Sequence, residues 1–106
     1  MDKRPVPKPL TTFVRSIKKQ FAPTKIILFG SRARGQGGKW SDYDLLILSD
    51  SFSKLSYLER LSQVYKFHPR TIPLDVICLT PKEYNQRKRE PTIISEIAKE
   101  GVELAV

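Results

Sequence analysis

Three short apolar runs constrain the fold of this chain more than any other feature. They are Lys25–Gly30, Asp42–Leu48 and Ile72–Leu79, and their length and aliphatic content are typical of buried β-strands. Segments with helical periodicity precede the first run, separate the second from the third, and follow the third. Strands and helices arranged in this order predict a small α/β domain, in which helices back a mixed sheet of few strands.

The helical segments are recognised by apolar residues that recur every three or four positions and by the signals at their ends. We expect helices over residues 10–21, 53–67, 81–90 and 91–100, and an edge strand over residues 102–106. The third helix has the clearest start, because Thr80 can cap it, Pro81 suits its first position and Glu83 can complete a capping box. Pro23 ends the first helix, and Gly101 ends the last.

The length and composition indicate one globular domain. At 106 residues, we expect a single domain over residues 10–106, preceded by a flexible arm over residues 1–9 that contains three prolines. A hydrophobic fraction of 40% and a charged fraction of 28% argue against a disordered or fibrous chain. One cysteine excludes an intramolecular disulfide, and no apolar run approaches the ~20 residues of a membrane span. We therefore expect a cytoplasmic protein with no membrane segment.

The formal charge of +8 is concentrated in the first part of the chain. Residues 1–40 carry ten lysines and arginines against one acidic residue, whereas residues 41–106 carry nine against ten. This asymmetry favours an anionic partner near the first segment, such as a nucleotide, a nucleic acid or an acidic protein surface. The alternative is that these charges only keep the protein soluble and a helix face solvated.

Gly30-Ser31 stands where the first apolar run ends, ahead of a short arginine-rich turn. A glycine at this point lets the backbone approach a ligand closely. Exposed N–H groups after a strand can bind phosphate oxygens, and the Ser31 hydroxyl adds a donor. Arg32 and Arg34 add positive charge, and an arginine can bind a phosphate through two parallel hydrogen bonds. These four residues are candidates for nucleotide binding, although Gly-Ser alone occurs in many turns.

Asp42 and Asp44 begin the second apolar run. Residues two apart on a strand point to the same face, with their α-carbons about 6.6 Å apart, so the two carboxylates can converge. At ~5 Å and an effective dielectric constant of ~20, their repulsion costs about 3 kcal/mol unless a cation offsets it. Mg²⁺ favours such carboxylates together with phosphate oxygens and water. A turn entering the strand would explain Asp42 equally well, but it would not explain Asp44.

Asp75 is the one acid inside the third apolar run. An unpaired carboxylate in an apolar strand is costly, and a metal shared with Asp42 and Asp44 would remove that cost. If the third strand lies beside the second, the three carboxylates meet at one edge of the sheet, and at least one is expected to keep its proton above the usual Asp range until metal binds. A lysine or arginine from a helix, or an exposed face, is the alternative explanation.

These elements together resemble a known signature. Gly30-Ser31, ten intervening residues and Asp42-Tyr43-Asp44 resemble the motif of the nucleotidyltransferase superfamily that includes DNA polymerase beta. The chain is most similar to its smallest branch, the minimal nucleotidyltransferases, which are often the antitoxin half of two-gene modules. Residues 29–35, 41–46 and 96–102 all look like that branch, and the resemblance covers roughly residues 10–105.

The resemblance implies a polymerase-beta palm-like fold and a role for each motif residue. Gly30 and Ser31 would contact the triphosphate of an NTP, while Asp42 and Asp44 would bind Mg²⁺, with two ions expected. Asp75 would be a third metal ligand or the base for the attacking hydroxyl. Larger members of the superfamily carry extra helical domains that hold the base and the acceptor, so a partner is expected to complete the acceptor site here.

The activity implied is transfer of a nucleoside monophosphate, expected to be AMP from ATP, to a hydroxyl acceptor. For an antitoxin of this branch, the acceptor would be a small helical toxin of the HEPN type. Two alternatives stay open: transfer to RNA or to a small molecule, and a non-catalytic antitoxin that binds nucleotide or toxin.

Four other features are given structural interpretations. His68 is expected in a surface loop, and Cys78 in the core, because nothing near it in sequence would activate the thiol. Trp40 is expected to pack rather than to stack on a base, and Arg87–Arg89 to form a solvated helix end rather than a contact with nucleic acid.

Overall fold

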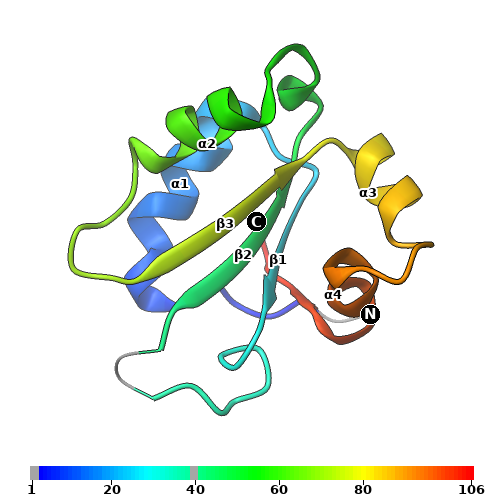
Figure 1. Cartoon of the computed structure of the whole chain (residues 1–106). Coiled ribbons are helices and arrows are strands. Elements are labelled where there is room, and N and C mark those ends of the chain that lie inside the picture. The colour runs from blue at the N-terminus through cyan, green and yellow to red at the C-terminus, as the bar shows by residue number, and fades with distance from the viewer. Residues whose placement is uncertain (1–2, 39–40) are drawn as a thin grey trace.

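A four-stranded mixed sheet forms the centre of the protein. The computed structural model describes residues 3–38 and 41–106, and the strand order is β3-β2-β1-β4 (Figure 1). The strands are β1 (Lys25–Phe29), β2 (Tyr43–Leu48), β3 (Leu74–Leu79) and β4 (Val102–Glu103). β1 runs antiparallel to both β2 and β4, whereas β2 and β3 are parallel. The predicted small α/β fold with a mixed sheet is therefore confirmed.

Helices cover both faces of this sheet. In the described part of the chain, the α-helices are α1 (Thr11–Phe21), α2 (Tyr57–Tyr65), α3 (Pro81–Arg87) and α4 (Ile93–Glu100), and the 3-10 helices are η1 (Lys8–Leu10) and η2 (Asp50–Lys54). In Figure 1, α1 and α2 lie on one side of the sheet, and α3 and α4 lie on the other. No helix within residues 3–38 and 41–106 is both long and apolar enough to span a membrane.

The strand β2 shows why the apolar runs are nearly continuous. Leu45 and Ile47 belong to the core cluster under α1 and α2, whereas Leu46 and Leu48 belong to the cluster under α4. All four side chains are buried. A strand covered on both faces needs apolar side chains at every position, so it loses the polar alternation of a half-exposed strand.

The prediction of a helix over residues 53–67 is wrong about where the helix begins. Residues 50–54 form the 3-10 helix η2, and Leu55 has extended backbone angles (φ −113°, ψ 142°) that separate it from α2. The Ser56 side chain then accepts a hydrogen bond from the Glu59 N–H, and Glu59 completes a capping box. This cap gives the α-helix a later beginning than its apolar periodicity suggested.

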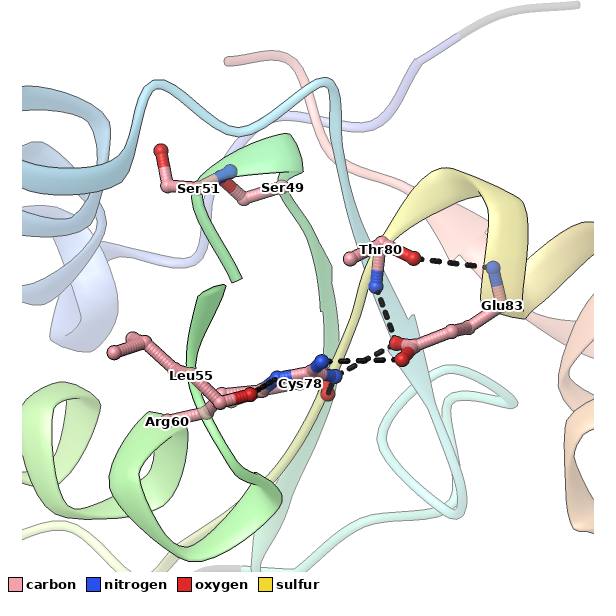
Figure 2. Close-up of polar contacts among 7 residues, drawn as sticks. All are labelled: Ser49, Ser51, Leu55, Arg60, Cys78, Thr80 and Glu83. Carbon is pink, nitrogen blue, oxygen red and sulfur yellow. Dashed lines mark hydrogen bonds and ion pairs between the residues drawn. The ribbon is translucent and has the colours of Figure 1, made fainter. Parts of the chain in front are cut away.

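A buried arginine connects α2, β3, α3 and Leu55, the residue that follows η2. Nη1 and Nη2 of Arg60 donate to the two carboxylate oxygens of Glu83 at 2.7 and 3.1 Å (Figure 2). Nη1 also donates to the Cys78 carbonyl at 3.1 Å, and Nε donates to the Leu55 carbonyl at 3.2 Å. Glu83 additionally accepts from the Thr80 N–H at 2.8 Å as part of the α3 capping box. Arg60 thus joins α2 to α3 through an ion pair, and to β3 and Leu55 through hydrogen bonds to two carbonyls.

Both outer edges of the sheet have polar partners. At β3, the Tyr65 hydroxyl accepts from the Val76 N–H at 2.9 Å and donates to the Leu74 carbonyl at 3.4 Å. At β4, the Arg4 N–H donates to the Glu103 carbonyl at 2.9 Å. Part of the expected N-terminal arm therefore lies against the sheet, and its mobility in solution stays a prediction.

Candidate metal and nucleotide site

Three carboxylates meet at the end of the sheet where β2 and β3 begin. Asp44 and Asp75 are direct partners in the parallel β2–β3 register, and Asp42 immediately precedes β2. Each residue offers one carboxylate oxygen, and these three oxygens lie within 4.8 Å of one another. The expected convergence of the three acids is thus present, because parallel strands in register begin at the same end of a sheet.

The three acids differ in exposure. Asp44 is half-buried, whereas Asp42 and Asp75 are exposed to solvent. Burial raises the pKa of Asp44 above its ordinary value, and the carboxylates of Asp75 and then Asp42 raise it further. The exposure of Asp75 corrects the expectation that its strand would make an unpaired carboxylate costly, because the residue lies near the solvated start of β3. Of the three, the most buried carboxylate, Asp44, is therefore the one at which a negative charge is most costly.

Gly30 lies directly against this cluster. Its backbone has a φ of +74°, a left-handed conformation that glycine adopts far more readily than other residues. A β-carbon at Gly30 would also collide with Oδ2 of Asp44. The backbone conformation and the close approach of a carboxylate both require glycine at this position.

The chain after Gly30 forms a compact turn. The Ala33 N–H donates to the Gly30 carbonyl at 3.1 Å, and the Gln36 N–H donates to the Ser31 carbonyl at 2.9 Å. Within the described residues, neither the N–H nor the hydroxyl of Ser31 donates a hydrogen bond. Donors at the start of such a turn, beside a glycine, are suited to an anionic ligand.

The two arginines of the turn are placed differently. Nε and Nη2 of Arg32 donate to the carbonyls of Ser41 and Gly38, both at 3.0 Å, and the guanidinium carbon lies 4.0 Å from the centre of the Tyr43 ring. Arg32 therefore holds the loop between β1 and β2, a role that its interpretation as a phosphate ligand did not anticipate. Arg34 is half-exposed, and its Nη1 lies 3.8 Å from Oε2 of Glu100 on α4.

The remaining candidates follow their structural interpretations where the structure describes them. Cys78 is fully buried, and burial raises the pKa of its thiol to about 12, so it is a core residue. His68 lies in the turn after α2, with its Nε2 2.7 Å from the Ile72 carbonyl oxygen. Trp40 lies outside the described residues. Arg87–Arg89 spans the end of α3, and all three residues are exposed.

The three carboxylates fit a magnesium site by their chemistry. Mg²⁺ is a hard cation that binds oxygen ligands, and protein sites commonly supply one or two carboxylates while phosphate oxygens and water complete the coordination. Asp42 and Asp75 are open to solvent, so a bound phosphate could reach the same ion. The donor set therefore suits a divalent metal that is shared with a phosphorylated ligand.

Comparison with known proteins agrees with this geometry. A family model of the nucleotidyltransferase domain matches residues 10–104, so the chain belongs to the nucleotidyltransferase domain family. Its reaction is therefore nucleotidyl transfer from an NTP, which in this family uses a divalent metal. No curated protein matches the chain.

Solved structures show the same fold in proteins of different kinds. A crystallised candidate nucleotidyltransferase from Sulfolobus solfataricus is 26% identical, with a TM-score of 0.61, and the match covers 74% of this chain and 70% of that protein. The BolA domain of SufE1 and BolA1, both from Arabidopsis thaliana, are 18% and 14% identical, with TM-scores of 0.55 and 0.57. Each match covers 74% of this chain and 98% of the Arabidopsis chain. At this identity the BolA likeness concerns the fold alone, since one fold can host unrelated functions.

Proposed function

We propose that this protein is a cytoplasmic, Mg²⁺-dependent adenylyltransferase that moves AMP from ATP to a hydroxyl group of a partner protein. The partner is a small helical toxin of the HEPN type, and this chain is the antitoxin of the pair. The observation that carries the proposal is the cluster of Asp42, Asp44 and Asp75, whose oxygens lie within 4.8 Å of one another beside the Gly30-Ser31 turn. The resemblance to minimal nucleotidyltransferases supports the choice of AMP and of a toxin.

Each residue of the cluster has a distinct role in this proposal. Asp42 and Asp44 hold the metal, and the free donors of Ser31 bind the triphosphate where Gly30 lets the backbone approach. Bound Mg²⁺ supplies positive charge that offsets the charge of the triphosphate and of the leaving pyrophosphate. Burial and then the charges of Asp75 and Asp42 raise the pKa of Asp44, and this supports the assignment because a bound cation would stabilise the ionised carboxylate.

The reaction itself is a substitution at the α-phosphorus. The acceptor hydroxyl oxygen forms a bond to that phosphorus while the bond to the bridging oxygen of the β-phosphate breaks, and pyrophosphate leaves. Asp75 takes the proton of the acceptor hydroxyl. Its exposure at the start of β3 supports this role, because an acceptor presented by another macromolecule can reach it. The chain's main contribution is to position the reactants and to place fixed charges around them.

Asp75→Asn tests this assignment. We expect the variant to transfer AMP about a hundredfold more slowly or worse, while its affinity for ATP changes little, because a base acts in transfer and not in holding the triphosphate. Parallel measurement of ATP binding and single-turnover transfer distinguishes the outcomes. A large loss of ATP affinity would make Asp75 a ground-state metal ligand, and normal transfer would leave it without a catalytic role.

The decisive test of the function is label transfer from ATP that carries a radiolabel on its α-phosphate. The purified chain, Mg²⁺ and labelled ATP are incubated with the protein encoded beside it, and separately with total RNA from the same cells. We expect the wild-type chain to transfer the label to the protein, and the Asp44→Asn variant to transfer none. Label on RNA alone would contradict the protein acceptor. Absence of transfer to every acceptor, with ATP still bound, would favour a non-catalytic antitoxin.

A further inference from the structure

A hollow of about 250 Å³ lies between the Gly30 turn and α4. Phe29, Ile93 and Ile97 give it apolar walls, and its rim carries the charged residues Arg34, Glu96 and Glu100. Phe29 is the direct register partner of Asp44 in the β1–β2 pair. The hollow therefore adjoins the carboxylate cluster, and Gly30 lines the hollow while it also touches Asp44.

The charges of the rim, two carboxylates and one guanidinium, favour a hydrogen-bond donor over a phosphate. Glu100 is paired with Arg34 at 3.8 Å. The carboxylate of Glu96 is exposed and forms no ion pair or hydrogen bond within residues 3–38 and 41–106. A free carboxylate repels phosphate oxygens and accepts hydrogen bonds from N–H groups. A ligand in the hollow is therefore expected to present an N–H group rather than an anionic one.

The walls and the size indicate a flat, apolar group. Ile93 is 59% exposed, although large apolar side chains of the described core are mostly buried. Ligand pockets for drug-sized molecules commonly measure ~300–1,000 Å³, so this hollow suits one part of a nucleotide rather than all of it. An aromatic ring placed against Ile93 and Phe29 would remove that exposed apolar surface from water.

We infer that this hollow is a base subsite for a nucleobase with an exocyclic amino group, which donates to the Glu96 carboxylate. The inference rests on the proposed function, because the triphosphate must lie at the Gly30-Ser31 turn for its base to reach α4. It adds a specificity-determining residue, Glu96, that no catalytic step requires. Adenine satisfies the condition, whereas hypoxanthine replaces the amino group with a carbonyl that Glu96 would repel.

The experiment compares three ligands in the presence of Mg²⁺: ATP, ITP and inorganic tripolyphosphate. Calorimetry on the full chain gives each dissociation constant. We expect ATP to bind about tenfold more tightly than ITP, the low end for one hydrogen bond to a charged group, and both ATP and ITP to bind more tightly than tripolyphosphate. In Glu96→Ala the ATP-to-ITP preference should fall close to one, while tripolyphosphate binds at least as well as before.

Two further variants make the test specific. Ile93→Ala should lose ATP affinity several-fold and leave tripolyphosphate binding unchanged, because it removes only an apolar contact with the base. Lys99→Ala, on the same helix but outside the hollow, is the control and should keep the full ATP preference.

Three results would overturn the base subsite: equal binding of ATP and ITP by the wild type, ATP binding no tighter than tripolyphosphate, or an ATP preference that persists in Glu96→Ala. Failure of the wild type to bind any of the three ligands would instead refute the proposed function, and the base subsite with it. A Glu96→Ala variant with unchanged ligand affinities but slower AMP transfer would assign the hollow to the acceptor and also overturn the inference.

Discussion

Breaking the ion pair between Arg60 and Glu83 should cause a large loss of stability that is specific to this pair. Glu83→Gln keeps the shape of the side chain and an oxygen that can still accept from the Thr80 N–H, but it removes the negative charge (Figure 2). Arg60 would then keep a guanidinium whose side chain is only 7% exposed and has lost its counter-charge. We expect the free energy of unfolding at neutral pH to fall by about 3 kcal/mol.

The size of this loss of stability follows from the pKa of the Glu83 carboxyl group. The hydrogen bonds from Arg60 are the largest cause that lowers the pKa of Glu83 from its ordinary value of 4.5 to about 2. One pKa unit corresponds to about 1.4 kcal/mol, so the shift corresponds to about 3 kcal/mol of native-state stability. Removal of one partner from a buried pair costs ~3–5 kcal/mol, and the low end applies because Glu83 is 30% exposed.

The lowered pKa of Glu83 also predicts how this stabilisation depends on pH. The pKa of Glu83 is lower in the folded protein than in the unfolded chain, so its contribution is complete above about pH 4.5 and is lost as the pH falls towards about 2. Glu83→Gln has no charge to titrate at this position. The stability difference between wild type and variant should therefore be constant near neutral pH and shrink steadily below pH 4.5.

Urea unfolding followed by circular dichroism, at pH 7 and at several values below 4.5, measures both effects. Glu59→Gln is the matched control, because Glu59 has the same capping-box position in α2 but is exposed and has no arginine partner among the residues that the structure describes. Equal losses in the two variants, or a difference that does not narrow at low pH, would refute the assignment of this stability to the Arg60 pair.

Three further predictions concern the carboxylate cluster. Mg²⁺ and ATP together should stabilise the fold by about 2.7 kcal/mol at a hundred times the dissociation constant, more than either does alone, and a melting curve unmoved by millimolar amounts of both would contradict nucleotide binding. Asp44→Asn should raise the melting temperature of the metal-free protein at neutral pH, because burial and the charges of Asp75 and Asp42 raise the pKa of Asp44 and disfavour its ionised form; a lower melting temperature would count against this repulsion. Gly30→Ala should abolish stabilisation by Mg²⁺ and ATP, whereas Gly35→Ala, with a φ of +72° but open space around it, should retain it, and equal responses would show that backbone strain alone is responsible.

The sequence by itself determined the features that depend on short chain segments. The apolar runs identified the strands β1, β2 and β3, and the capping box of Thr80 and Glu83 identified the start of α3. The spacing of Asp42 and Asp44 was informative because side chains two positions apart in an extended chain point to the same side, even though Asp42 lies immediately before β2. Helix boundaries near Ser56 were less predictable, because a local cap competed with a continuous apolar periodicity.

Only the tertiary structure decided how distant segments meet. Asp75 joins Asp42 and Asp44 because β3 pairs in parallel and in register with β2, and the periodicity of a strand does not state which neighbour it pairs with. The pairing of Arg60 with Glu83 and the position of α4 beside the Gly30 turn have the same origin. These contacts depend on the packing of helices on both faces of the sheet, and that packing reflects the whole set of buried side chains rather than any single motif.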